Sequence, residues 1–223
     1  HAQAKALGLE FCSVAMTGFY AQSFATRPTY ERMVKDAIDT AKALGVKVVF
    51  LPLGVQGDLV KNPELRPRIV ERLKAVAPLA EQAGVTIGLE TALDAAGEVA
   101  LLDEIGSEAV KSYFNFSNAL KNGRDVNAEL RTLGRERICQ IHATDDDGVW
   151  LENNTRLDLK AVKGTLDAMG WSGWLVVERS RDAKRPTDVR WNFTANVKYL
   201  KRIFQGKPEA AAKSEPGPGP GGA

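Results

Sequence analysis

Four polar residues end, or lie within, apolar runs of the sequence and could together perform metal or acid–base chemistry. The runs are VTIGLE, SYFNFSN, ICQIH and WLVVE, and the residues are Glu90, Asn115, His142 and Glu178. Successive members are 25, 27 and 36 residues apart, which is close to one strand–helix unit of about 31 residues. Two carboxylates in one buried site need a cation or a proton between them. Because the donors are mixed nitrogen and oxygen atoms, the sequence predicts a divalent cation: Mn²⁺, Mg²⁺, Co²⁺ or Zn²⁺.

Each of these residues also has an ordinary structural interpretation. A lone Glu at a strand end more often forms a salt bridge than acts in catalysis, and a His in an apolar strand is usually a hydrogen-bonded core residue. Asn115 could simply bond to loop backbone. The regular spacing over four consecutive strands favours a shared site over four separate structural roles.

The elements that must position these residues follow a repeating pattern. Six times a helix-compatible segment ends at a glycine, which tolerates the left-handed conformation that terminates a helix. The β-rich runs that follow are 9–16, 46–53, 85–91, 110–118, 138–144 and 174–180. Amphipathic helices are predicted at 29–44, 62–82, 95–105, 126–133, 159–169 and 188–204. Several of the β-rich runs are almost continuously apolar, which is typical of strands covered on both faces in a parallel sheet.

This alternation predicts an α/β fold, specifically a partial TIM (β/α) barrel. A full barrel needs about 250 residues, whereas 1–206 supply six strand–helix units, so we expect the first one or two strands to be missing. An open doubly wound sheet is the alternative, but the segment at 16–19 lacks the spacing of a glycine-rich phosphate loop. We expect 1–206 to form the barrel domain and the Pro/Gly-rich segment 207–223 to be disordered.

Composition limits the function classes. The 223 residues have a formal net charge of +2, two cysteines and two histidines. Near-neutral charge argues against nucleic acid or an anionic membrane as the main partner, and no apolar run approaches the ~20 residues that span a bilayer. Two cysteines exclude a disulfide scaffold and a cysteine-built zinc site. Because the first residue is His1, the compartment cannot be read from the N-terminus, and cytoplasmic is only a default.

The segments GVTIGLE, SYFNFSNALKNGRDV, ICQIHATD and GWSGWLVVERS resemble the motifs of the sugar phosphate isomerase/epimerase family of xylose isomerase-like TIM barrels. The resemblance extends from about residue 7 to residue 204. It implies a divalent metal held at Glu90, Asn115, His142 and Glu178, with the two glutamates as the acid/base pair. The sequence departs from the family at Asn115, where the family carries Asp, so the site has two carboxylates rather than three. We expect weaker cation binding, a different cation preference, or altered catalysis.

The resemblance implies a small-molecule sugar substrate and an isomerase or epimerase that abstracts the proton next to a ketose carbonyl through an enediolate. A metal-dependent keto-sugar lyase starts from the same proton abstraction and stays open. A non-catalytic sugar-binding descendant with a degenerate metal site also stays open. The endonuclease branch of the superfamily needs several histidines and a basic groove, which this sequence lacks. Oligomeric state is open, with a homo-oligomer among the alternatives.

Four further residues are candidate substrate contacts. Asn118 and Asp145 match polar positions of the family motifs, and Thr144 replaces the family's Lys between His142 and Asp145. Phe19 and Trp150 follow predicted strands and could form an apolar wall over a sugar.

Overall fold

Six parallel strands form one sheet whose strand order follows the chain. The computed structural model describes residues 1–206, so the predicted tail at 207–223 lies outside the described residues. The strands are β1 (Val14–Ala15), β2 (Val48–Pro52), β3 (Thr86–Glu90), β4 (Val110–Asn115), β5 (Ile138–His142) and β6 (Leu175–Val176). The prediction of a partial (β/α) barrel with six strand–helix units is therefore confirmed.

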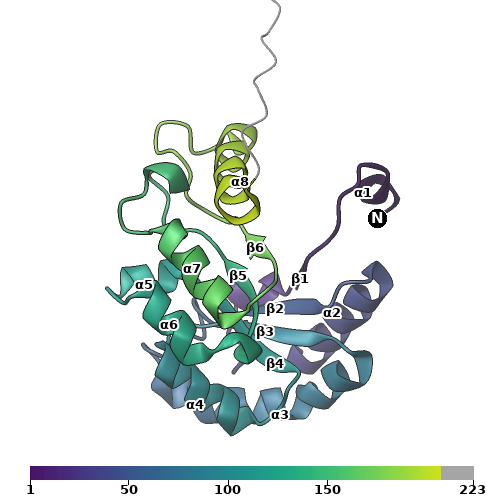
Figure 1. The fold of residues 1–223 in the computed structure, drawn as a ribbon. Coiled ribbons are helices and arrows are strands. Elements are labelled where there is room, and N and C mark those ends of the chain that lie inside the picture. Colours follow the sequence, from purple (N-terminus) through teal and green to yellow (C-terminus); the bar gives the residue numbers. More distant parts are fainter. Residues whose placement is uncertain (207–223) are drawn as a thin grey trace, which may run out of the picture.

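Helices connect the strands and cover one side of the sheet (Figure 1). The α-helices of the described chain are α1 (Ala2–Ala6), α2 (Tyr30–Leu44), α3 (Arg66–Ala83), α4 (Ala95–Ile105), α5 (Phe116–Lys121), α6 (Val126–Leu133), α7 (Leu159–Met169) and α8 (Val189–Gln205). Short 3₁₀ turns are η1 (Thr17–Tyr20), η2 (Pro63–Leu65), η3 (Arg135–Arg137) and η4 (Leu151–Asn153). Helix α1 has no buried residue and stands apart from the other elements in Figure 1.

The strands at the two edges of the sheet are shorter than predicted. Strands β1 and β6 have two residues each, because each is bonded to a neighbouring strand on one side only. Strand β4 stops at Asn115, whose side chain accepts a hydrogen bond from Ser117 N and caps α5. Asn118 consequently lies in a helix and not in the predicted strand 110–118.

The core has a large outer part between sheet and helices and a small inner part. The inner cluster consists of Val48, Phe50 and Tyr113, with Cys139 and Val176 packed against it. Gly88 is required there, since a Cβ on it would lie 2.8 Å from Cys139 Sγ and 3.2 Å from Tyr113 Cβ. The inner face is therefore filled by aromatic side chains below the carboxyl ends of the strands.

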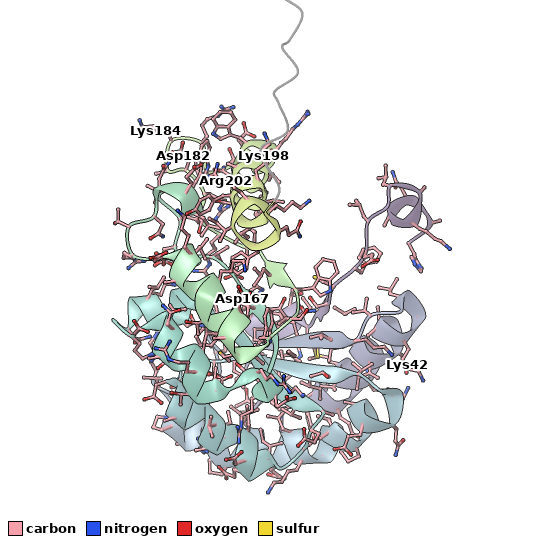
Figure 2. The ribbon with its side chains drawn as sticks, in the orientation of Figure 1. Lys42, Asp167, Asp182, Lys184, Lys198 and Arg202 are labelled. Carbon is pink, nitrogen blue, oxygen red and sulfur yellow. The ribbon has the colours of Figure 1, made fainter. Side chains whose placement is uncertain are left out.

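Several charged side chains lie on the outside of the fold near its C-terminal helix. Asp182, Lys184, Lys198 and Arg202 gather around α8 and the loop that precedes it, as Figure 2 shows. Within residues 1–206, every helix is too short or too polar to cross a bilayer.

Candidate metal and acid–base site

The alternation of side chains between the two faces of each strand places the predicted site residues on the inner face of the sheet. Side chains two residues apart share a face; Glu90 therefore lies on the same face as Gly88, and Asn115 on the same face as Tyr113. Asn115 pairs in register with His142, and Glu90 with Pro52. Glu178 follows β6 by two residues. All four side chains consequently reach the carboxyl-terminal end of the sheet, where (β/α) barrels bind their ligands.

The His142 ring rests on two aromatic rings of the inner cluster. Its centroid lies 5.1 Å from that of Phe50 and 4.5 Å from that of Tyr113. His142 is 6% exposed, and the packing of its imidazole against these two rings limits rotation of the side chain. They turn Nδ1 toward the carboxylates of Glu90 and Glu178.

Glu90, His142 and Glu178 form one compact cluster. His142 Nδ1 lies 2.5 Å from Glu90 Oε2 and 3.7 Å from Glu178 Oε2. One candidate ligand atom from each side chain lies within 4.8 Å of the others. The side chains are 12%, 8% and 24% exposed in that order. Two carboxylates and an imidazole in a largely buried position are a donor set that fits a divalent cation such as Mn²⁺ or Zn²⁺.

Asn115 joins the cluster through its amide nitrogen. Nδ2 donates to Glu90 Oε2 and to Glu178 Oε1, each at 3.1 Å, while Oδ1 accepts from Ser117 N at 2.9 Å. The structure thus brings all four predicted residues together. The atom that Asn115 presents to the carboxylates is a donor and not the oxygen expected of a metal ligand.

A second charged group borders the cluster on the side of Glu178. Arg179 Nε lies 3.4 Å from Glu178 Oε1, and Asp146 is paired with Lys121 at 2.9 Å and with Arg179 at 3.5 Å. The side chains of these ion pairs are between about a quarter and a half exposed, so each pair contributes little to stability. Their effect is to place positive charge next to one of the two carboxylates.

The predicted contacts Asn118 and Asp145 are both engaged by protein groups. Asn118 Nδ2 donates to the carbonyl of Thr91 at 2.9 Å and so ties α5 to the end of β3. The carboxylate of Asp145 accepts from Asn154 and from Arg156, whose Nη2 is 2.6 Å away. Although burial favours the neutral acid, these hydrogen bonds hold the pKa of Asp145 below its usual value.

The predicted aromatic wall is arranged differently from the expectation. Phe19 is 1% exposed and packs edge-on against Phe24, so its ring belongs to the core. Its neighbour Tyr20 is 38% exposed. Burial, followed by the charges of Glu90 and Glu178, raises the pKa of Tyr20 to about 12. Tyr20 is not among the predicted residues, because the conformation of η1 determines which of the two adjacent rings is buried in the core.

Trp150 and the loops around the site are held by α8. Trp150 Nε1 donates to Asn192 Oδ1 at 2.9 Å, and its ring lies 5.2 Å from that of Trp191. Asn196 Nδ2 donates to Ser180 O at 2.8 Å, and Asn196 Oδ1 accepts from Leu151 N. Both asparagines are fully buried. Helix α8 therefore fixes the loops that follow β5 and β6.

The parallel sheet and its outer helices define a partial (β/α) barrel, and the polar cluster lies at the end of the strands where such barrels bind ligands. The chain belongs to the xylose isomerase-like TIM-barrel family, to which residues 1–201 match. No curated protein matches the sequence.

Solved structures share the fold at low sequence identity. The 3-keto-D-glucoside 4-epimerase YcjR from E. coli aligns with a TM-score of 0.72 and 15% identity, over 90% of this chain and 82% of that one. An L-ribulose 3-epimerase aligns with a TM-score of 0.72 and 18% identity, over 92% and 78%. The D-psicose 3-epimerase from Clostridium cellulolyticum H10, solved with D-tagatose, gives 0.72 and 16%, over 91% and 81%.

Proposed function

We propose that this protein is a carbohydrate isomerase or epimerase that moves a proton at the carbon next to a ketose carbonyl. The observation that carries the proposal is the meeting of Glu90 and Glu178 at one imidazole on the ligand-binding end of the barrel. The names of the similar structures, which are sugar epimerases, are consistent with it.

The two carboxylates have the roles of base and acid. One glutamate removes the proton, and the other returns a proton from the opposite face of the carbon, which inverts its configuration. They come from β3 and from the segment after β6, so they approach a substrate from different strands. His142 holds the position of Glu90 through the 2.5 Å contact of Nδ1 with Oε2.

Glu90, His142 and Glu178 would hold a divalent cation, while Asn115, expected from the sequence as a fourth ligand, directs its amide nitrogen toward the two carboxylates. A cation bound there supplies Lewis acidity that offsets the negative charge which develops on the sugar oxygen. Substrate contact is proposed for Tyr20 in place of Phe19, because Tyr20 is partly exposed and the charges of both glutamates act on its hydroxyl. Asn118, Asp145 and Trp150 are proposed to shape the substrate pocket by fixing its loops, through the hydrogen bonds described above.

The proposal is tested by proton exchange in D₂O. Purified protein with Mn²⁺ is incubated with D-fructose, D-tagatose, D-psicose and L-ribulose, and ¹H NMR follows loss of the signals next to the carbonyl. We expect exchange with at least one ketose, and loss of that exchange by about 10²-fold or more in Glu90→Gln and Glu178→Gln. Glu136→Gln, an exposed carboxylate paired with Arg135, should exchange like wild type. Absence of exchange in wild type with every ketose contradicts the proposal.

The same spectra separate the lyase alternative. Elimination begins with the same proton abstraction, but it gives a new unsaturated or dicarbonyl product in place of an epimer. Sugar binding with no exchange would identify a non-catalytic descendant instead.

A further inference from the structure

The side-chain amide of Asn115 lies between the carboxylates of Glu90 and Glu178 and bonds to both. It is 4% exposed, and its two amide protons are directed to Glu90 Oε2 and Glu178 Oε1 at equal distances of 3.1 Å. Glu90 Oε2 also receives the contact from His142 Nδ1. The amide nitrogen therefore bonds to both carboxylates of the candidate cation site, and on Glu90 it bonds to the oxygen that also contacts His142.

The orientation of the amide is set by the backbone. Ser117 N is a donor, so the atom of Asn115 that faces it must be an acceptor. Turning the amide over would place Nδ2 against that N–H, leave the first turn of α5 uncapped, and remove both donors from the carboxylates. The surroundings allow one orientation, and in it Oδ1 is directed away from the carboxylates.

A carboxylate at this position would behave differently. It has two acceptor oxygens, so one could cap α5 while the other faced the cluster. An amide has a single oxygen, which the cap uses. The choice between amide and carboxylate at residue 115 therefore decides whether the cluster contains a donor or a third negative charge.

From this geometry we infer that Asn115 is an internal substitute for the cation: it cross-links Glu90 and Glu178 in the metal-free protein and opposes cation binding by hydrogen bonding to both carboxylates that would bind the cation. The inference rests on the proposed function only in taking the cluster as a cation site. It assigns three metal ligands, Glu90, His142 and Glu178, and gives Asn115 the role of a positioning residue that keeps the acid/base pair together without metal.

The test compares wild type with Asn115→Asp and Asn115→Ser by thermal unfolding in EDTA and in MnCl₂, together with calorimetric titration of Mn²⁺. In EDTA, Asn115→Asp should melt below wild type, since three carboxylates then lack a donor. In Mn²⁺ it should melt above wild type, with an affinity for Mn²⁺ higher by about tenfold or more. Asn115→Ser retains a capping oxygen and adds no charge. Its melting temperature should rise more on Mn²⁺ addition than that of wild type.

Asn122→Asp is the matched control, because it adds the same charge near α5 at an exposed residue whose amide bonds to Asn118 O and not to the cluster. Its Mn²⁺ affinity should stay within about twofold of wild type. The inference is overturned if Asn115→Asp is as stable as wild type in EDTA, or if its Mn²⁺ affinity does not rise. It is also overturned if Asn122→Asp gains as much affinity. If Asn115→Asp does not fold, an equal response of Asn115→Ser and wild type to Mn²⁺ overturns it.

A different result would contradict the proposed function. If the Mn²⁺ affinities and melting temperatures change as described but no ketose exchanges its proton, the role of Asn115 stands and the isomerase proposal does not.

Discussion

The hydroxyl of Ser180 bonds to the backbone of Asp145, so the loops after β5 and β6 are joined directly beside the site. Oγ accepts from Asp145 N at 3.0 Å and lies 3.3 Å from Asp145 O. Ser180 is fully buried and has a φ of 64°, the one positive φ of a non-glycine residue in the described chain. A left-handed serine two residues after Glu178 stores backbone strain in a segment that must aim a functional carboxylate.

Ser180→Ala should destabilise the protein by about 1–3 kcal/mol, because it leaves the buried N–H of Asp145 without an acceptor while the strain remains. Ser180→Gly loses the same hydrogen bond but relieves the left-handed backbone, so it should cost about 1 kcal/mol less than the alanine variant. Urea unfolding measures both. An alanine variant as stable as wild type, or more stable than the glycine variant, would contradict this interpretation.

The buried carboxyl group of Glu98 should make the stability of the protein depend on pH. Burial raises the pKa of Glu98 to about 7 from an ordinary 4.5, against the opposing hydrogen bond from Thr91 and with a smaller contribution from the charge of Glu90. The folded state therefore binds this proton more tightly than the unfolded state. The stability it contributes is present below pH 4.5 and is lost as the pH rises through about 7.

Glu98→Gln removes this titration. The variant should match wild type near pH 4.5 and exceed its stability above pH 7 by about 3 kcal/mol. Urea unfolding at several pH values measures the difference, with Glu104→Gln, exposed on the same helix and paired with Arg66, as the control. A pH-independent difference between Glu98→Gln and wild type would show that Glu98 is not the titrating group.

Gly88 should not tolerate a larger residue. Gly88→Ala places a Cβ 2.8 Å from Cys139 Sγ and 3.0 Å from Tyr113 Cδ2, and overpacking of this kind costs about 1–3 kcal/mol. Since Tyr113 supports the His142 ring, Mn²⁺ affinity should also fall. Gly164→Ala, in the interior of α7 with open space at its Cβ, should stabilise the protein by about 0.5–1 kcal/mol. Equal melting temperatures for the two variants would refute the packing described here.

Tyr20→Phe should lower kcat/KM for a reactive ketose by about tenfold, because a protonated hydroxyl that donates to the sugar is removed. Mn²⁺ affinity should not change, since Tyr20 is not one of the three ligands. Tyr199→Phe, a tyrosine of α8 next to Arg202, is the control and should leave kcat/KM as in wild type. An unchanged kcat/KM in Tyr20→Phe would show that the Tyr20 hydroxyl does not contact the substrate.

Much of the fold and the core of the site could be predicted from the sequence. The glycines that end helices are local signals, and Gly45, Gly84, Gly106 and Gly170 have the expected left-handed backbone. Glu90 and His142 could be placed because each ends an apolar strand, where period-two alternation and parallel pairing leave few choices.

The remaining features depend on contacts between distant segments. The direction of the Asn115 amide is decided by Ser117 N, and the choice between Phe19 and Tyr20 by the packing of Phe24. The strain at Ser180 requires the loop after β5 to be in place. Composition and periodicity do not contain this information, because it arises only when the loops meet.

The central claim is that Glu90, His142 and Glu178 hold one divalent cation at the carboxyl ends of the strands. Anomalous diffraction from crystals grown with Mn²⁺, recorded near the manganese absorption edge, tests it directly. We expect one dominant peak about 2.1 Å from an oxygen of each glutamate and from a ring nitrogen of His142. A dominant manganese peak elsewhere in the molecule, with none among these three side chains, would contradict it.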